Sequence, residues 1–129
     1  MSGKYDAARD AFGSAALSWT ESRIVARLVS TAFLFNHAAR DPAGLAGLLG
    51  EPVELEHKTL AAGWAGASTI LFKQVAGAAK AGGIVLYSPA DEGRGPVLIV
   101  HLNEIDKFPM QLNGGDIEID VPDPGLFRI

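Results

Sequence analysis

Residues 96–102 read Pro-Val-Leu-Ile-Val-His-Leu, and apart from the histidine the run after the proline is wholly apolar. Successive side chains of an extended chain point to opposite faces. The expected faces are Val97, Ile99 and His101 on one side and Leu98, Val100 and Leu102 on the other. A strand that is apolar on both faces is typical of the centre of a covered sheet. This stretch therefore predicts the central strand of the core.

Shorter stretches on both sides of this run also fit strands. Their expected ranges are 53–59, 68–75, 83–87, 116–121 and 126–129. Alternation gives three of them one mainly apolar face: Val53 and Leu55 together with His57; Ile70 and Phe72; Ile117, Ile119 and Val121. Turn-forming Gly, Pro and Asn residues separate the strands, most clearly at Asn113-Gly114-Gly115. The pattern is that of short antiparallel strands joined by tight connections.

The first half of the chain is less uniform. Apolar residues at three- and four-residue spacing predict a helix over residues 5–17 that stops near Gly13, where glycine weakens it. Residues 23–30 contain several β-branched residues and fit either a helix or a strand. Residues 31–50 are expected to form a loop, with a helical turn at 43–49.

A chain of 129 residues fits a single structural domain, here residues 1–129. Its hydrophobic content of 48% and charged content of 20% are those of a globular protein. The expected fold is mainly β: an antiparallel β-sandwich or barrel of about five to seven short strands with one N-terminal α-helix.

Composition also excludes several classes of function. The chain has no cysteine, which rules out disulfides, thiolate metal sites and cysteine nucleophiles. A net charge of −4 argues against binding to nucleic acid, which needs clustered Lys and Arg. No apolar run approaches the roughly 20 residues that span a bilayer, and the charged N-terminus does not resemble a signal peptide. We therefore expect neither a nucleic-acid nor a membrane partner.

The residues that could carry chemistry do not form a recognisable motif. The three histidines, His37, His57 and His101, lack metal-ligand spacing among themselves and with Glu54, Glu56 and Glu104. We interpret His57 and His101 as strand residues with ordinary hydrogen-bond partners. Acidic residues along 116–120 occupy the polar face of a strand, where solvation explains them. The sequence predicts no catalytic residue, no metal ligand and no cofactor, and so no enzyme.

Several segments, in this order, resemble a family of small structural proteins from tailed bacteriophages. They are residues 4–12 (KYDAARDAF), 23–29 (RIVARLV), 83–87 (GIVLY), 97–101 (VLIVH), 112–119 (LNGGDIEI) and 125–129 (GLFRI). The resemblance implies a strand at 23–29 and supplies no catalytic residues. Residues 33–50 depart from the family's polar loop, because they are richer in Ala and Leu.

The resemblance leads us to expect a non-enzymatic virion structural protein. Its expected role is capsid decoration, as a cement protein across capsomer junctions, made in the host cytoplasm and located on the capsid surface or tail. The expected partners are the major capsid protein, other virion proteins and further copies of this chain. The alternatives are a tail or neck component, and a carbohydrate-binding module for host attachment with Trp19 and Trp64 as stacking platforms.

Large apolar residues in irregular segments are the candidates for the contact surface, because such residues are enriched at interfaces. The interface candidates are Trp19, Phe33, Phe35, Leu45, Leu48 and Trp64. The alternative is that these side chains pack inside the protein.

Overall fold

The computed structural model describes residues 3–40, 42, 45–77, 80–90, 95–103, 108–122 and 125–128. In chain order its elements are β1 (Gly3–Lys4), α1 (Asp6–Gly13), β2 (Val25–Ser30), β3 (Leu48–Glu54), β4 (Thr59–Ala61), β5 (Trp64–Gly66), β6 (Ile70–Phe72), β7 (Lys80–Ser88), β8 (Val97–Leu102), β9 (Met110–Gln111), β10 (Ile117–Ile119) and β11 (Phe127–Arg128). Strands dominate and all their pairings are antiparallel, which confirms the predicted sandwich-like β fold with one helix among the described residues.

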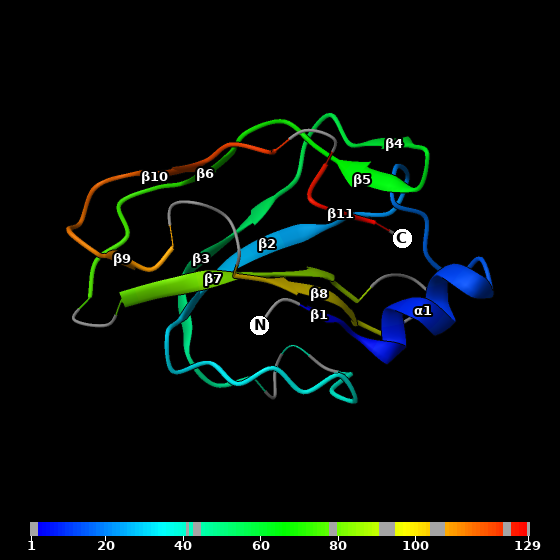
Figure 1. The fold of residues 1–129 in the computed structure, drawn as a ribbon, viewed down its shortest axis with the longest axis horizontal. Helices are drawn as coiled ribbons and strands as arrows, with labels where there is room; N and C mark the ends of the chain where they lie inside the picture. Colours follow the sequence, from blue (N-terminus) through cyan, green and yellow to red (C-terminus); the bar gives the residue numbers. More distant parts are fainter. Residues whose placement is uncertain are drawn as a thin grey trace.

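The main sheet contains the longest strands and has the order β1-β8-β7-β2-β3, with β9 beside the start of β7 (Figure 1). Every residue of β8 is buried, so the prediction of a central, covered strand at 97–102 is confirmed. β2 lies between β7 and β3, which shows that residues 25–30 form a strand and resolves the ambiguity in that segment.

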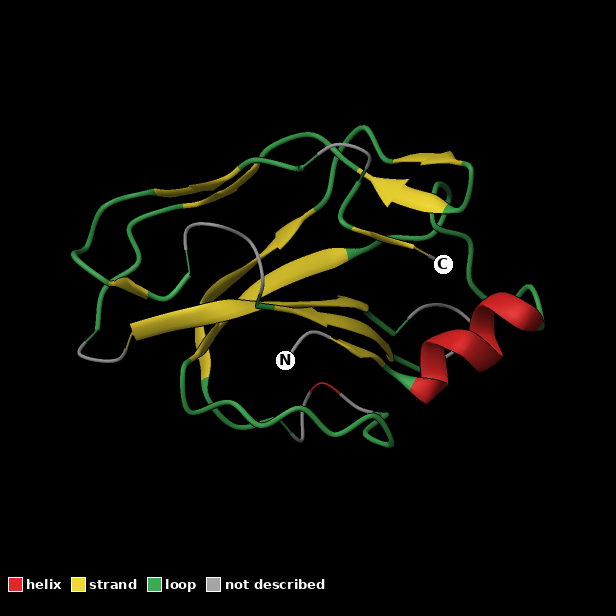
Figure 2. Ribbon diagram, viewed as in Figure 1, coloured by secondary structure: helices red, strands yellow, loops and turns green. Residues whose placement is uncertain are grey.

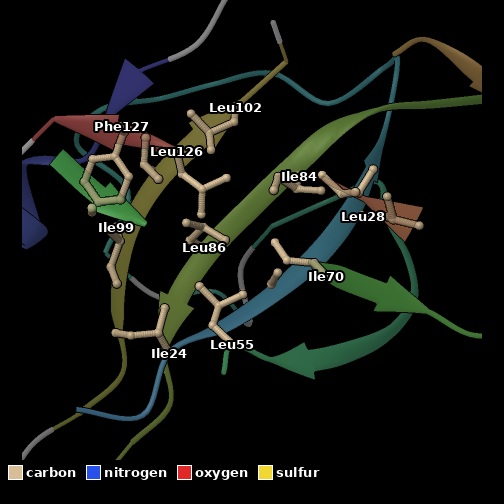
Figure 3. Close-up of a cluster of buried hydrophobic side chains, with 14 of the residues drawn as sticks. Ile24, Leu28, Leu55, Ile70, Ile84, Leu86, Ile99, Leu102, Leu126 and Phe127 are labelled. Carbon is tan, nitrogen blue, oxygen red and sulfur yellow. The ribbon is translucent and has the colours of Figure 1, made fainter. Parts of the chain in front are cut away.

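Two smaller sheets cover one face of the main sheet. One pairs β10 with β6, and the other has the order β11-β5-β4. Figure 3 shows the core between these layers, where Ile84 and Leu86 of the main sheet meet Ile70, Leu126 and Phe127 of the covering segments. Burial of each such side chain contributes about 1.5–3 kcal/mol. This core is the principal source of the fold's stability.

The side chains of β8 do not alternate as expected. Leu86 of β7 pairs with Val100 and Tyr87 pairs with Leu98, so the intervening Ile99 forms a β-bulge. Because of this extra residue, Ile99 and Val100 both join the core between the sheets, while Leu98 faces the opposite side. His101 also faces that side, so the prediction that it shares a face with Ile99 is wrong.

Helix α1 begins after Tyr5 and ends at Gly13, as the sequence predicted. Ala7, Ala8 and Ala11 form its buried face, and the small side chains allow the helix to lie close to β8. No helix in the described part of the chain combines the length and apolar composition needed to cross a bilayer.

Two expectations for residues 43–59 are wrong. β3 ends at Glu54 and β4 begins only at Thr59, so the predicted strand over 53–59 is broken at a bend. His57 lies in this bend, exposed and with a φ of +50°, and not on a buried strand face. The predicted helical turn over 43–49 includes Ala43 and Gly44, which lie outside the described residues, and its last two residues, Leu48 and Leu49, belong to β3.

Candidate interaction surface

A long loop covers the second face of the main sheet. We call residues 31–47 the aromatic loop; Asp41, Ala43 and Gly44 within it are outside the described residues. Figure 2 shows it running below the strands, on the side opposite the two smaller sheets. Its ends meet where the backbone N–H of Ser30 donates to the carbonyl of Gly47 at 2.8 Å. Closed ends and packing against the protein are the properties of a compact Ω-loop.

Two phenylalanines attach the aromatic loop to the sheet. The ring of Phe33 lies 4.7 Å from the ring of His101, and Phe35 lies 4.9 Å from Tyr5. β1 passes so close beneath Phe35 that a Cβ on Gly3 would lie 2.6 Å from the ring. Offset and tilted aromatic pairs of this kind each stabilise by about 0.5–1.5 kcal/mol beyond the area that they bury. The two rings therefore fix the loop on the sheet.

The four loop and strand candidates from the sequence are brought together here. Phe33, Phe35, Leu45 and Leu48 are all half-buried. They pack against a second apolar cluster formed by Tyr5, Val29, Val85 and Leu98. The sequence left open whether these side chains pack inside the protein or form a contact surface. In the structure they pack on the sheet and also keep part of their surface exposed.

Polar contacts hold the aromatic loop to the start of α1. The backbone N–H of Asp6 donates to the carbonyl of His37 at 2.9 Å, which satisfies one free donor of the helix N-terminus. The Asp6 carboxylate also contacts Nδ1 of His37 at 2.9 Å, and Asp10 lies 3.9 Å from Arg40. Both pairs are largely exposed and therefore add little stability. Their effect is to set the loop's position against the helix.

Leu34 lies between the two attached phenylalanines and points away from the protein. Its side chain is 87% exposed, the larger of the two values for exposed large apolar residues among the described positions. Because Phe33 and Phe35 face the sheet, alternation along the extended segment turns Leu34 outward. Leu34 was not among the interface candidates predicted from the sequence. The pattern Phe-Leu-Phe contained the signal, since three apolar residues in an extended segment cannot all face one sheet.

A second exposed apolar group lies on the other side of the molecule. Leu60, on the edge strand β4, is 51% exposed. In the neighbouring strand β5, Trp64 is half-buried and lies opposite Ala61 and Arg128, which are both exposed. Trp64 therefore stays available as a contact residue, and Leu60 and Trp64 make the small sheet of β4, β5 and β11 a second candidate contact region, although the pairing of Leu60 with Ala65 places the two on different faces of that sheet.

Trp19 does not belong to any surface. It is 1% exposed, its Nε1 donates to the carbonyl of Gly66 at 3.0 Å, and its ring meets Phe127 edge-on at 5.3 Å. The prediction that it is an interface residue is wrong, because the turn that carries it folds over β5 and directs the ring inward. The same burial removes it as a platform for stacking on a sugar.

The titratable side chains named from the sequence are dispersed. His37 is exposed beside Asp6, His57 is exposed in the bend before β4, and His101 is buried under Phe33. Glu104 lies outside the described residues. Within the described ranges, no three His, Asp or Glu side chains gather where they could hold a metal ion.

The hydroxyl of Tyr5 is a buried polar group beneath the aromatic loop. Tyr5 has no exposed surface, and its hydroxyl has no hydrogen-bond partner among the described residues. We expect Tyr5→Phe to raise the free energy of unfolding at pH 7 by about 1 kcal/mol, because it removes an unsatisfied buried hydroxyl. Urea denaturation of the two proteins measures this difference.

The same residue predicts a difference at alkaline pH. Burial raises the pKa of Tyr5 from 10.0 to about 12. Between these values the unfolded chain loses the phenolic proton and the folded chain keeps it, so stability falls as pH rises, by up to about 1.4 kcal/mol per pH unit. Tyr5→Phe lacks this slope. Parallel stability curves for the two proteins between pH 10 and 12 would contradict the assignment.

No family model matches this chain, and neither a curated protein nor a solved structure matches it.

Proposed function

We propose that this chain is a non-enzymatic virion structural protein that decorates a bacteriophage capsid and binds across capsomer junctions. The resemblance of its sequence segments to small structural proteins of tailed phages supports the context. The exposed Leu34 on a firmly attached loop supports the mode of action. The proposed partners are the major capsid protein and neighbouring copies of this chain.

The observation that carries the proposal is the setting of Leu34. Its side chain is 87% exposed, while Phe33 and Phe35 on either side are packed onto the sheet. Binding costs less conformational entropy when the contact residue is already held in place. An apolar side chain in such a position gains burial energy on contact without first ordering its loop. Half-exposed Phe33 and Phe35 extend the apolar area around it.

A protein that joins two capsomers needs two contact surfaces that point in different directions. The aromatic loop covers one face of the main sheet, and β4 and β5 belong to the layer that covers the other face. The aromatic loop that carries Leu34 and the strand β4 that carries Leu60 therefore lie on opposite sides of the main sheet. Two surfaces on opposite sides of the sheet fit a bridging role better than a single binding surface would.

Modest contacts are sufficient for such a role. A standard interface buries about 800 Å² on each partner. A bridging protein that holds one capsomer binds the second at a high effective concentration, so that two weak contacts act together. Repetition over a shell then resists opening of the lattice.

The test uses particles of the phage that encodes this chain, assembled without it and incubated with the purified protein. We expect wild-type protein to bind and Leu34→Ser to lose most of its binding, because the change removes the exposed apolar group. The folded stability should change by no more than about 0.5 kcal/mol, since Leu34 makes no core contact. Sedimentation with particles and urea denaturation measure the two quantities.

Controls separate the alternatives. Ala38→Ser, a change at another exposed position of the aromatic loop, should bind as wild type does. Leu60→Ser should still bind but should stabilise the shell less against heat, because it removes one side of the bridge.

Absence of the polypeptide from intact virions would contradict the proposal. Density restricted to a ring below the capsid would favour the tail or neck alternative, and glycan binding lost in Trp64→Ala would favour the carbohydrate-binding alternative.

A further inference from the structure

An apolar cleft lies between α1 and two strands beside it, β8 and β11. Its volume is about 410 Å³. Its walls include Ala8 and Phe12 of α1, Ile99 of β8 and Phe127 of β11. Ile99 has no exposed surface and Phe127 is 7% exposed, so these two residues form its floor. Cavities of about 300–1,000 Å³ with mostly apolar walls are typical of small-molecule sites.

The polar residues that line the cleft are both cations. Lys4 and Arg9 complete its lining, together with the backbone of Gly13. The Lys4 ammonium donates one hydrogen bond to the carbonyl of Arg128 at 3.0 Å. An ammonium has three N–H donors, so this bond leaves it able to contact an anion. The guanidinium of Arg9 has no ion pair with any residue in the described part of the chain.

The acidic residues of α1 lie on a different side of the helix. Asp6 and Asp10 are four positions apart, so they share one helical face, and there they contact His37 and Arg40 of the aromatic loop. Arg9 lies about 100° around the helix from Asp10, toward the cleft. In a chain with a net charge of −4, the helix thus separates its charges and places a cation beside this cleft.

We propose that this cleft binds small amphipathic carboxylates, with the apolar tail against Phe12, Ile99 and Phe127 and the carboxylate between Lys4 and Arg9. Charge complementarity identifies the headgroup, because a carboxylate here gains two favourable contacts and a cation would be repelled. The volume of about 410 Å³ indicates the size of the apolar tail, because it has room for a short chain or a ring. This site is independent of the proposed capsid role.

The test is titration of the isotopically labelled protein with decanoate, below its micelle-forming concentration, followed by NMR. We expect chemical-shift changes at Arg9, Phe12, Ile99 and Phe127 that reach saturation as the decanoate concentration rises. Lys4→Gln and Arg9→Gln should each weaken binding about fivefold, as expected for a partly exposed ion pair. Arg40→Gln removes the same charge on the other side of the helix and should leave decanoate binding unchanged.

A second variant tests the location of the site. A Cβ on Gly13 meets no atom within 4 Å and the residue does not have a positive φ, so larger side chains are tolerated there. Gly13→Leu should project into the cleft and weaken decanoate binding more than tenfold, while Gly13→Ala should leave binding close to wild type. Equal binding of decyltrimethylammonium, unchanged binding in Gly13→Leu, or no saturable binding of decanoate would each overturn the proposal. None of these outcomes depends on capsid binding.

Discussion

Trp19→Ala is expected to lower the free energy of unfolding by about 3–5 kcal/mol, the range for removing a large aromatic side chain from a core. The indole is 1% exposed and meets Phe127 edge-on at 5.3 Å. Its loss leaves a cavity between the turn after α1 and β5, and it leaves the carbonyl of Gly66 without the indole donor. An unsatisfied buried acceptor alone costs about 1–3 kcal/mol. Urea denaturation followed by circular dichroism measures the change.

The chain offers a matched control in its other tryptophan. Trp64 is half-buried on the outer side of β5, so Trp64→Ala removes the same atoms from a site that solvent already reaches. We expect it to cost less than half as much as Trp19→Ala. Trp19→Phe should fall between them, because it retains a ring and loses the hydrogen bond to Gly66. Equal losses at Trp19 and Trp64 would contradict the division into a core and a surface tryptophan.

Two alternating strands were predicted well from the sequence, although a third, over residues 53–59, is broken at a bend. Ile70 and Phe72 of β6 and Ile117 and Ile119 of β10 face inward as expected, and Ile70 pairs with Ile119 across the small sheet. The period of two is informative here because polar residues alternate with the apolar ones. The same rule failed in β8, where apolar residues on both faces give no signal for the bulge at Ile99. The position of that bulge is set by the pairing of β8 with β7, and this pairing cannot be inferred from the sequence of β8 alone.

Short strands escaped prediction for a related reason. β1, β5 and β9 contain two or three residues each, too few for any periodicity. They form because distant segments supply partners: β1 pairs with β8 at Gly3 and His101, and β11 pairs with β5 at Phe127 and Ala65. Whether such short segments form strands therefore depends on tertiary contacts.

The candidate surface was predicted in part. Phe33, Phe35, Leu45 and Leu48 were identified as interface candidates because they are large apolar residues in an irregular segment, and they do gather over one face of the main sheet. Composition could not separate the side chains that face the sheet from the one that faces solvent. Leu34 became the leading contact residue only when the positions of its neighbours were known. The prediction that Trp19 is an interface residue was wrong because its position beside a turn suggested exposure, whereas β5, a strand far along the chain, buries it.

Gly83→Ala is expected to destabilise the fold by about 3 kcal/mol, at the upper end of the range for overpacking a core. Gly83 is buried in β7, where a Cβ would lie 2.5 Å from the carbonyl oxygen of Leu102 and 3.2 Å from Cα of Asn103. Both obstacles are backbone or close to it, so no side-chain rotation relieves the contact. β8 would have to move away from β7, which breaks the pairing of Ile84 with Leu102 in the middle of the main sheet.

The same substitution at Gly13 separates this steric effect from the general effect of replacing glycine. An added Cβ at Gly13 finds open space, and alanine favours the helical conformation by up to about 1 kcal/mol over glycine. Gly13→Ala should therefore stabilise the protein slightly while Gly83→Ala destabilises it strongly. The two changes alter the unfolded chain in the same way, so their difference reports the folded state alone. If urea denaturation gave similar stabilities for both variants, the backbone at Leu102 would not approach Gly83 as closely as the structure has it.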